Sequence, residues 1–217
     1  MKWLLAGMLL LMGACAQLPT IEPMEANRIP AIEMDCRSHF PQGRWQLVHT
    51  IRARFYGGRQ ATFTGVVVLS THNESIHCVL MTLEGMVLFE AVDDRHSITV
   101  KRAFGPFENP DFAQGVMADI RFLFFMPEGG LITAGAINDG TRTCRYQGQG
   151  RTIVDLMEVN GGGWAMHQYD AHGKLLRRAV ADAVNSQGIA SRMGIDAGSS
   201  RHAYHLSMDL VESVKLP

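Results

Sequence analysis

The sequence predicts a mainly β domain, an antiparallel sheet or barrel of about eleven strands with one helix. Two observations carry this prediction. From Trp45 onward apolar and polar residues mostly alternate, and turn residues interrupt the alternation every ~8–12 residues, which is typical of antiparallel strands. Residues 112–123 instead repeat their apolar positions with the period of a helix. Hydrophobic residues make up 47% of the 217 residues, which is enough for a packed core.

The N-terminus has the features of an export signal. Lys2 is basic, and the apolar run 3–12 that follows is too short to span a bilayer, which needs ~20 residues. Gly13, Ala14 and Cys15 come next, and this order resembles the lipobox of bacterial lipoproteins. The resemblance implies cleavage of a signal peptide over 1–14 and lipidation of the Cys15 sulfur. The alternative is an ordinary secretory signal in which Cys15 has no such role.

The residues after Cys15 indicate the membrane to which the lipoprotein is sorted and the length of the connection to its domain. The next residue is Ala16 rather than Asp, which by resemblance to other bacterial lipoproteins implies the outer membrane. Residues 15–43 contain four prolines and show no apolar period. We therefore predict a lipidated cysteine and a flexible tether over 15–43, before a single β domain over 44–217.

Three further cysteines are present, Cys36, Cys78 and Cys144. In an oxidising compartment they allow at most one internal disulfide and leave one thiol, and the sequence does not say which pair forms. No two of them have the C-x-x-C spacing of a zinc or redox site, so we predict no metal.

Five strands are predicted before the helix. In the first of them Leu47, His49 and Ile51 alternate with polar neighbours, and Gly57-Gly58 marks the turn that follows. The same alternation and similar turns place the five strands at 45–55, 62–69, 76–80, 86–91 and 97–103.

The helix begins with a clear signal. Asn109 suits an N-cap, and Pro110 suits the first helical position. We expect the apolar stripe of this helix to cover the open side of the sheet as a lid, and to form an uncharged lining of a cavity between them. The alternative is a helix that plugs a fully packed core. The stripe consists of Phe112, Val116, Ile120 and Leu123.

Six more strands follow the helix. Asp139-Gly140 predicts a hairpin between the first two, because this pair suits turns with positive φ. Residues 185–200 are rich in Gly and Ser and poorly periodic, so we predict no strand there. The six strands are expected at 131–136, 142–146, 151–159, 164–169, 175–183 and 204–210.

Composition and motifs argue against several functions. The chain has 20 basic and 21 acidic residues and lacks the positive charge of a nucleic-acid-binding protein. No hydrolase, nucleotide-binding or zinc-protease motif is present. His202 and His205 differ by three within a predicted strand and would point to opposite faces, which does not favour a metal site. We predict no enzyme and no cofactor, although a Ser-His-Asp set assembled only in space stays open.

Methionine and aromatic residues indicate one kind of ligand. Ten of the 13 methionines lie after residue 14, and their flexible, polarizable side chains suit a surface that accepts varied acyl chains. The alternative is an ordinary core filled by methionine. The side chains of this kind on apolar strand faces are Phe63, Met86, Leu88, Trp164, Met166, Tyr204, Leu206 and Met208.

The region from Trp45 to the C-terminus resembles the lipoprotein-carrier superfamily typified by LolA and LolB. The likeness consists of an anchored N-terminus, five opening strands, a helix after the fifth, and a turn at 83–85. LolB-like chains usually carry Pro-Leu-Gly at this turn, where the present chain has Leu83-Glu84-Gly85. Within the superfamily the chain is similar to uncharacterised outer-membrane lipoproteins associated with aryl-polyene pigment clusters, through Gly85-Met86-Val87-Leu88-Phe89 and Phe124-Phe125-Met126-Pro127.

This resemblance implies a curved sheet that forms an incomplete barrel, closed by one or more helices around an apolar cavity for lipid or acyl chains. It implies a monomeric outer-membrane lipoprotein that faces the periplasm and traffics lipoproteins or hydrophobic compounds, with an acylated ligand and a periplasmic carrier protein as partners. Leu83 is the membrane-facing loop candidate. The cavity-lining candidates are Phe63, Leu88, Phe112, Val116, Ile120, Trp164, Met166, Tyr204, Leu206 and Met208.

Two other functions stay open at this point. One is a scaffold lipoprotein of the outer membrane, for which a filled barrel would be expected. The other is an enzyme that modifies envelope lipids, which would require His, Ser and an acidic residue to converge inside the cavity.

Overall fold

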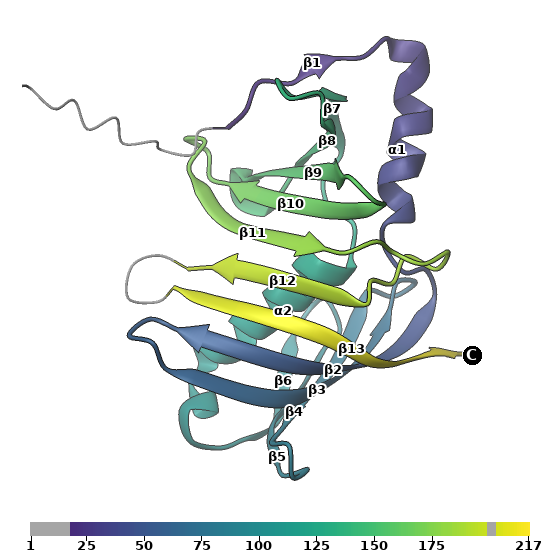
Figure 1. Ribbon diagram of the computed structural model, residues 1–217. Coiled ribbons are helices and arrows are strands. Elements are labelled where there is room, and N and C mark those ends of the chain that lie inside the picture. The colour runs from purple at the N-terminus through teal and green to yellow at the C-terminus, as the bar shows by residue number, and fades with distance from the viewer. Residues whose placement is uncertain (1–17, 199–202) are drawn as a thin grey trace, which may run out of the picture.

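Thirteen strands pair into one antiparallel sheet in the computed structural model, which describes residues 18–198 and 203–217 (Figure 1). The strand order is β1-β7-β8-β9-β10-β11-β12-β13-β2-β3-β4-β5-β6. The sheet ends at β1 and β6 and does not close into a barrel. This confirms the predicted class, a mainly β fold with an incomplete barrel and covering helices. The signal peptide predicted for 1–14 and Cys15 lie outside the described residues.

The elements have the following bounds. The α-helices of the described residues are α1 (Ile29–Ser38) and α2 (Pro110–Phe124). Short 3-10 helices are η1 (Ala26–Arg28), η2 (Gly105–Glu108) and η3 (Gln149–Arg151). The strands before α2 are β1 (Glu22–Pro23), β2 (Arg44–Phe55), β3 (Gln60–Ser70), β4 (Ser75–Met81), β5 (Val87–Asp93) and β6 (Ile98–Ala103). The strands after it are β7 (Leu131–Ala136), β8 (Arg142–Gln147), β9 (Ile153–Val159), β10 (Gly163–Tyr169), β11 (Leu175–Ala181), β12 (Arg192–Ala197) and β13 (Tyr204–Leu216).

All eleven predicted strands are present, and the structure adds β1 and β12. Strand β12 lies inside the segment for which no strand was predicted. Its Met193, Ile195 and Ala197 do alternate inward, but the strand is short and lies in a segment rich in Gly and Ser, which hid the pattern. Because β12 pairs β11 with β13, it joins the two halves of the sheet.

Helix α2 begins as its sequence predicts. The Asn109 side chain accepts a hydrogen bond from the Asp111 backbone N–H at 3.0 Å, and Pro110 occupies the first helical position. Figure 1 shows α2 behind β12 and β13, on the inner face of the curved sheet. The core therefore lies between this helix and the strands that curl around it.

The flexible tether predicted through residue 43 is wrong for residues 22–38. These residues form β1, which pairs with β7, then η1 and the ten-residue helix α1. A disulfide joins Cys36 of α1 to Cys144 of β8, which leaves Cys78 as a buried thiol. The prolines misled the prediction because Pro30 falls in the first turn of α1, where proline is tolerated.

The inner face of the sheet carries the core. Leu47, Leu69 and Phe89 are fully buried there, and burying a side chain of this size stabilises the fold by ~1.5–3 kcal/mol. His49 shares this face and is 3% exposed, with its ring beside that of Phe124.

Candidate functional site

The apolar stripe of α2 packs on a filled part of the core. The ring of Phe112 lies 5.1 Å from that of Phe89 and 4.9 Å from that of Phe107, both edge to face. Phe107 also reaches Phe63 of β3, at 6.0 Å between ring centroids. Aromatic pairs in this geometry are favourable beyond the area they bury. The N-terminal part of α2 is therefore tightly packed against the sheet, and little room for a ligand remains there.

A cavity of about 1170 Å³ lies instead beside the C-terminal half of α2. The face of α2 that borders this cavity is not the apolar stripe. It carries Gln114, Ala118 and Arg121, and Phe125 follows directly after the helix. These positions follow one another at three- and four-residue spacing and so share a face. The expected lining without charge is therefore wrong, because the stripe with no charge faces the sheet.

The inner wall of the cavity is mainly apolar. It is formed by the far end of α2, the loop after it, and the inner faces of β8 to β10. Methionine is prominent in this wall, and its flexible side chain can repack around ligands of different shape. The apolar residues of this wall are Met117, Phe122, Phe124, Phe125, Met126, Leu131, Tyr146, Val154 and Met166.

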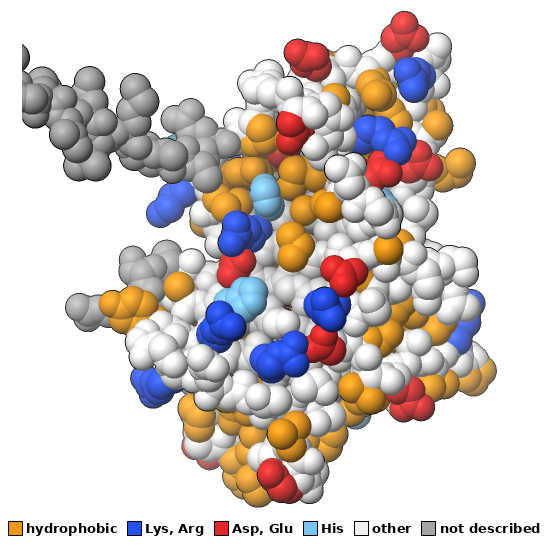
Figure 2. All heavy atoms as spheres, viewed as in Figure 1, with side chains coloured by type: hydrophobic (Ala, Val, Ile, Leu, Met, Phe, Trp, Pro, Cys, Tyr) orange, Lys and Arg blue, Asp and Glu red, His pale blue; other side chains and the backbone are white. Residues whose placement is uncertain are grey.

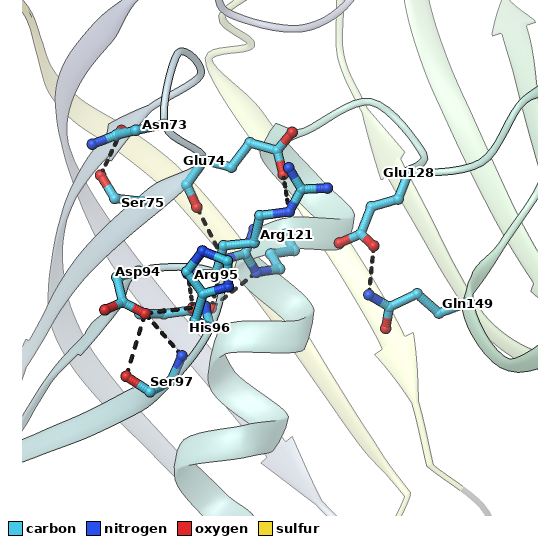
Figure 3. Close-up of polar contacts among 11 residues, drawn as sticks. Asn73, Glu74, Ser75, Asp94, Arg95, His96, Ser97, Arg121, Glu128 and Gln149 are labelled. Carbon is cyan, nitrogen blue, oxygen red and sulfur yellow. Dashed lines mark hydrogen bonds and ion pairs between the residues drawn. The ribbon is translucent and has the colours of Figure 1, made fainter.

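Arg121 anchors α2 to two turns at the mouth of the cavity (Figure 3). Its guanidinium pairs with the Asp93 carboxylate at 2.8 Å and donates to the backbone oxygen of Glu74 at 2.9 Å. Both partners lie at hairpin turns, Glu74 between β3 and β4 and Asp93 at the end of β5. The Asp93 side chain is 6% exposed, so this ion pair is shielded from water.

Backbone strain is concentrated in the same turns. Glu74 has φ 51° and Arg95 has φ 75°, values that non-glycine residues rarely adopt. Their side chains pair with each other at 3.1 Å, and the Asp93 carboxylate accepts a hydrogen bond from the Arg95 backbone N–H at 2.7 Å. Each charge at this part of the mouth thus has an opposite partner.

Asp119 forms a second anchor between α2 and the sheet. Its carboxylate accepts hydrogen bonds from Arg177 of β11, at 2.9 Å, and from the Tyr204 hydroxyl of β13. Burial raises the pKa of Asp119 despite these two donors, and burial together with the neighbouring carboxylate raises the pKa of Tyr204. The helix is therefore held to the sheet by polar contacts on two of its sides.

The opposite rim of the cavity comes from the loop after α2 and from α1. The Gln149 amide donates to the Glu128 carboxylate across this rim (Figure 3). Gly129 lets the loop approach β8 closely, since a Cβ at this position would lie 1.9 Å from the Gln147 backbone oxygen. On α1, Arg37 pairs with Glu33 at 2.8 Å. The disulfide to β8 holds α1 in place as one wall.

The structure places the ten predicted lining residues in different surroundings. Met166 is among the residues that line this cavity. Trp164 packs against Phe40 with 5.7 Å between the rings, and Tyr204 bonds to Asp119. The candidates that pack in or against the core, apart from the cavity lining, are Phe63, Phe112, Val116, Ile120, Trp164, Tyr204, Leu206 and Met208.

Leu88 was predicted on the inner face of its strand, and this is wrong. Phe89, the next residue, is fully buried in the core, whereas Leu88 is half-buried and lies apart from the core cluster. Leu83 lies in the β4–β5 turn and is 62% exposed, beside Met86 at 60%.

Sequence reasoning missed the polar anchors. Arg121 and Asp93 are 28 residues apart, and Asp119 lies 85 residues from Tyr204. No local pattern links such positions. The available signal was that α2 carries two opposite charges, Asp119 and Arg121, close to its apolar stripe.

Two features typical of other kinds of site do not occur among the described residues. No group of three or more His, Cys, Asp or Glu side chains there is arranged to hold a metal ion. No described helix is long and apolar enough to span a bilayer.

Comparison with known proteins supports the fold. No protein-family model and no curated protein matches the chain. A LolA superfamily protein from Nitrosomonas europaea is similar over 87% of this chain and 94% of its own, with TM-score 0.56 and 14% identity. A domain from Vibrio parahaemolyticus named for outer-membrane lipoprotein sorting is similar over 85% and 90%, with TM-score 0.50 and 8% identity. The chain therefore has a LolA-like fold.

Proposed function

We propose that this protein is an outer-membrane lipoprotein of the periplasmic side that holds a lipid or acyl chain in the cavity beside α2. It would serve the trafficking of lipoproteins or hydrophobic compounds. The observation that carries the proposal is the cavity of about 1170 Å³ with its methionine- and phenylalanine-rich inner wall. The LolA-like fold, shared with a domain named for lipoprotein sorting, supports it. The finer likeness to lipoproteins of aryl-polyene clusters stays a prediction.

The size and chemistry of the cavity suit such a ligand. Pockets for small molecules typically measure ~300–1,000 Å³ and are mostly apolar with a few polar groups. Transfer of ~400 Å² of acyl surface from water would contribute ~10 kcal/mol before the entropy costs of binding. The charges at the mouth are mostly paired with one another, so the inner wall dominates recognition.

The anchors of α2 fix this helix, so the loop after it is the wall of the cavity that an acyl chain would displace. The loop 125–131 joins α2 to β7 and lines the cavity, while Arg121 and Asp119 hold the helix to the sheet. Entry of an acyl chain would displace this loop and leave the buried ion pairs in place. The protein would need no catalytic group for this task.

Membrane attachment belongs to the same proposal. Lipidation of Cys15 would place the domain on the outer membrane, where it could receive its ligand from a periplasmic carrier protein. The exposed Leu83 and Met86 of the β4–β5 turn offer apolar side chains that could enter the headgroup region of a membrane.

A pair of tryptophan substitutions in α2 tests the carrier function. Ala118 is exposed and lines the cavity, so in Ala118→Trp the ring would occupy the cavity with little loss of stability. Binding of a fluorescent fatty-acid probe should weaken at least ~10-fold, which corresponds to 1.4 kcal/mol. Val116 packs against the core two residues earlier, and Val116→Trp should instead cost ~1–3 kcal/mol of stability through overpacking.

Probe titration and thermal unfolding of the three proteins decide the outcome. Wild-type protein that binds no probe would reject the carrier function in favour of a scaffold lipoprotein. Unchanged probe affinity in Ala118→Trp would place the ligand outside this cavity.

A further inference from the structure

The first described residues form a strap across the outer face of the sheet. Leu18 touches the β10–β11 turn, where a Cβ at Gly173 would lie 3.3 Å from the Leu18 Cβ. The Pro19 backbone oxygen accepts a hydrogen bond from Arg145 of β8 at 2.7 Å. Glu22 and Pro23 then pair with β7 at the edge of the sheet. The strap thus runs from the β10–β11 turn to the β7 edge.

This strap is firmly held. Arg145 also binds Asp155 of β9 through two nitrogens, at 2.6 and 2.7 Å, and Asp155 is fully buried. On the inner face, the residue before Arg145 is Cys144, which forms the disulfide to α1. The chain is therefore fixed on both faces of β8, and residues 18–38 supply no slack between the domain and an anchor.

Cys15 precedes Leu18 by three residues, so the two Cα atoms lie at most ~11 Å apart. We propose that the end of the sheet next to Leu18 lies on the membrane, with the β10–β11 and β2–β3 turns against anionic lipid headgroups. This inference rests on the proposed lipidation of Cys15. A long flexible tether would let the domain take any orientation, whereas this short connection gives the domain a defined orientation on the membrane.

Topology places both turns at that end. Every neighbouring pair from β10 to β3 is antiparallel, so the β10–β11 and β2–β3 turns lie at the same end of the strands. Figure 1 shows both turns at the left, on the side where the described chain begins. The surface defined by these two turns is named the anchor end.

The side chains of the anchor end suit a lipid headgroup layer. Tyr56 is 60% exposed, and exposed tyrosine is enriched at membrane interfaces. Arg54, Arg59 and Lys174 are exposed and form no ion pair with a described residue. Basic side chains near a bilayer are attracted to anionic lipids. Figure 2 shows Lys and Arg side chains along this left border, with hydrophobic ones between them.

The opposite end of the same strands has different chemistry. Its turns at 160–162 and 182–191 contain one charged residue, Asp182, and no basic residue. The two turns of the anchor end therefore carry more basic side chains than these two turns, while Arg44 of β2 and Lys215 of β13 also lie on the opposite side.

Depth measurements on the acylated chain in vesicles test this orientation. Single cysteines at Ala171→Cys and Gln60→Cys report on the anchor end, and Asn160→Cys and Ser186→Cys report on the opposite end. All four positions are exposed, whereas the native cysteines of the domain are disulfide-bonded or buried. Each variant is labelled with a fluorophore and placed in vesicles of phosphatidylethanolamine and phosphatidylglycerol that contain a spin-labelled quenching lipid.

Quenching at 171 and 60 should exceed quenching at 160 and 186 several-fold. A flexible Gly-Ser insertion between Ala16 and Gln17 is the matched control and should reduce this difference, because it adds slack while it keeps Cys15. Equal quenching at all four sites, or deeper burial of 160 and 186, overturns the orientation. Mass spectrometry of the same samples reports acylation. If the chain is not acylated, both this orientation and the proposed lipid anchor at Cys15 are overturned. Binding of the fatty-acid probe tests the cavity independently of the anchor.

Discussion

At the scale of single residues, Arg121 joins three segments that are far apart in the sequence. It connects α2 to the β3–β4 turn and to the end of β5, and its guanidinium also lies 5.6 Å from the centre of the Phe125 ring. Breaking a buried ion pair by removal of one partner is costly because the other charge stays buried. The stability of the cavity mouth should therefore depend strongly on this one side chain.

We expect Arg121→Met to lower the free energy of unfolding by ~3–5 kcal/mol, because Asp93 would lose its partner. Adding Asp93→Leu should recover part of the loss. Arg37→Met is the control: Arg37 forms an exposed pair with Glu33, and its loss should change stability by ~0.5 kcal/mol or less. Urea unfolding of the four proteins measures these differences, and equal losses in Arg121→Met and Arg37→Met would contradict the argument.

His49 predicts a pH dependence. Burial lowers its pKa in the folded protein from 6.5 to about 4, against a smaller opposite effect of Asp209. As the pH falls from 6.5 to about 4, the unfolded chain therefore binds a proton that the folded chain does not, and stability decreases. Below about pH 4 both forms bind the proton and this loss stops. The full effect is ~3 kcal/mol.

Urea midpoints measured across this pH range check the contribution of His49. In His49→Leu the decrease in stability on acidification should be smaller than in the wild type. His96→Gln changes an exposed turn residue and should behave as the wild type does. Identical slopes in His49→Leu and wild type would contradict the lowered pKa of His49, because they would mean that it binds its proton equally in the folded and unfolded chains.

At the scale of elements, helix α1 depends on a covalent bond for its position. Only Ile32 and Cys36 of its ten residues are buried, so its own apolar contacts are few. The disulfide to Cys144 closes a sequence separation of 108 residues. Because α1 forms one wall of the cavity, this bond links the redox state of the protein to the shape of its candidate site.

The double variant Cys36→Ala/Cys144→Ala should lose ~2–5 kcal/mol of stability. Limited proteolysis should cleave it at Arg37, which the intact protein protects. Reductant should destabilise the wild type by a similar amount and leave the double variant unchanged. Cys78 does not complicate the comparison, since burial raises the pKa of its thiol to about 12 and keeps it unreactive. A reductant effect that persists in the double variant would contradict this assignment.

At the scale of the whole molecule, the open sheet and its inner helix define a container that is filled at one end and hollow at the other. The Phe63–Phe107–Phe112–Phe89 cluster closes the filled end, and the cavity beside the C-terminal half of α2 forms the hollow one. The strap over the outer face connects this container to the segment that would carry the lipid. Anchoring and ligand binding thus involve different faces of the same sheet.

Cys15→Ser tests the anchor. It should abolish incorporation of labelled palmitate and move the protein from the membrane to the soluble fraction. The Cys36→Ala/Cys144→Ala protein, which keeps Cys15, should retain both label and membrane attachment. Unchanged labelling of Cys15→Ser would show that this cysteine is not the lipidated residue.

The sequence by itself determined eleven of the thirteen strands, helix α2 with its Asn109 cap, and the limit of one disulfide among Cys36, Cys78 and Cys144. These features depend on alternation, turn chemistry and capping, which are local. Leu88 shows where local information ends. It lies in the continuous apolar run 86–89, which has no alternation to assign a face, and only pairing with β4 and β6 turned Phe89 inward.

The tertiary structure alone decided the pairing of Cys36 with Cys144, the strap over β8, the anchors of Arg121 and Asp119, and the position of the cavity. Each depends on groups that lie far apart in the chain and meet because the sheet curls around α2. An apolar stripe predicts that a helix buries one face. Whether the neighbouring face of the helix contacts side chains or a cavity depends on how the side chains of several distant strands pack together. The sequence of the helix carries no information about that packing.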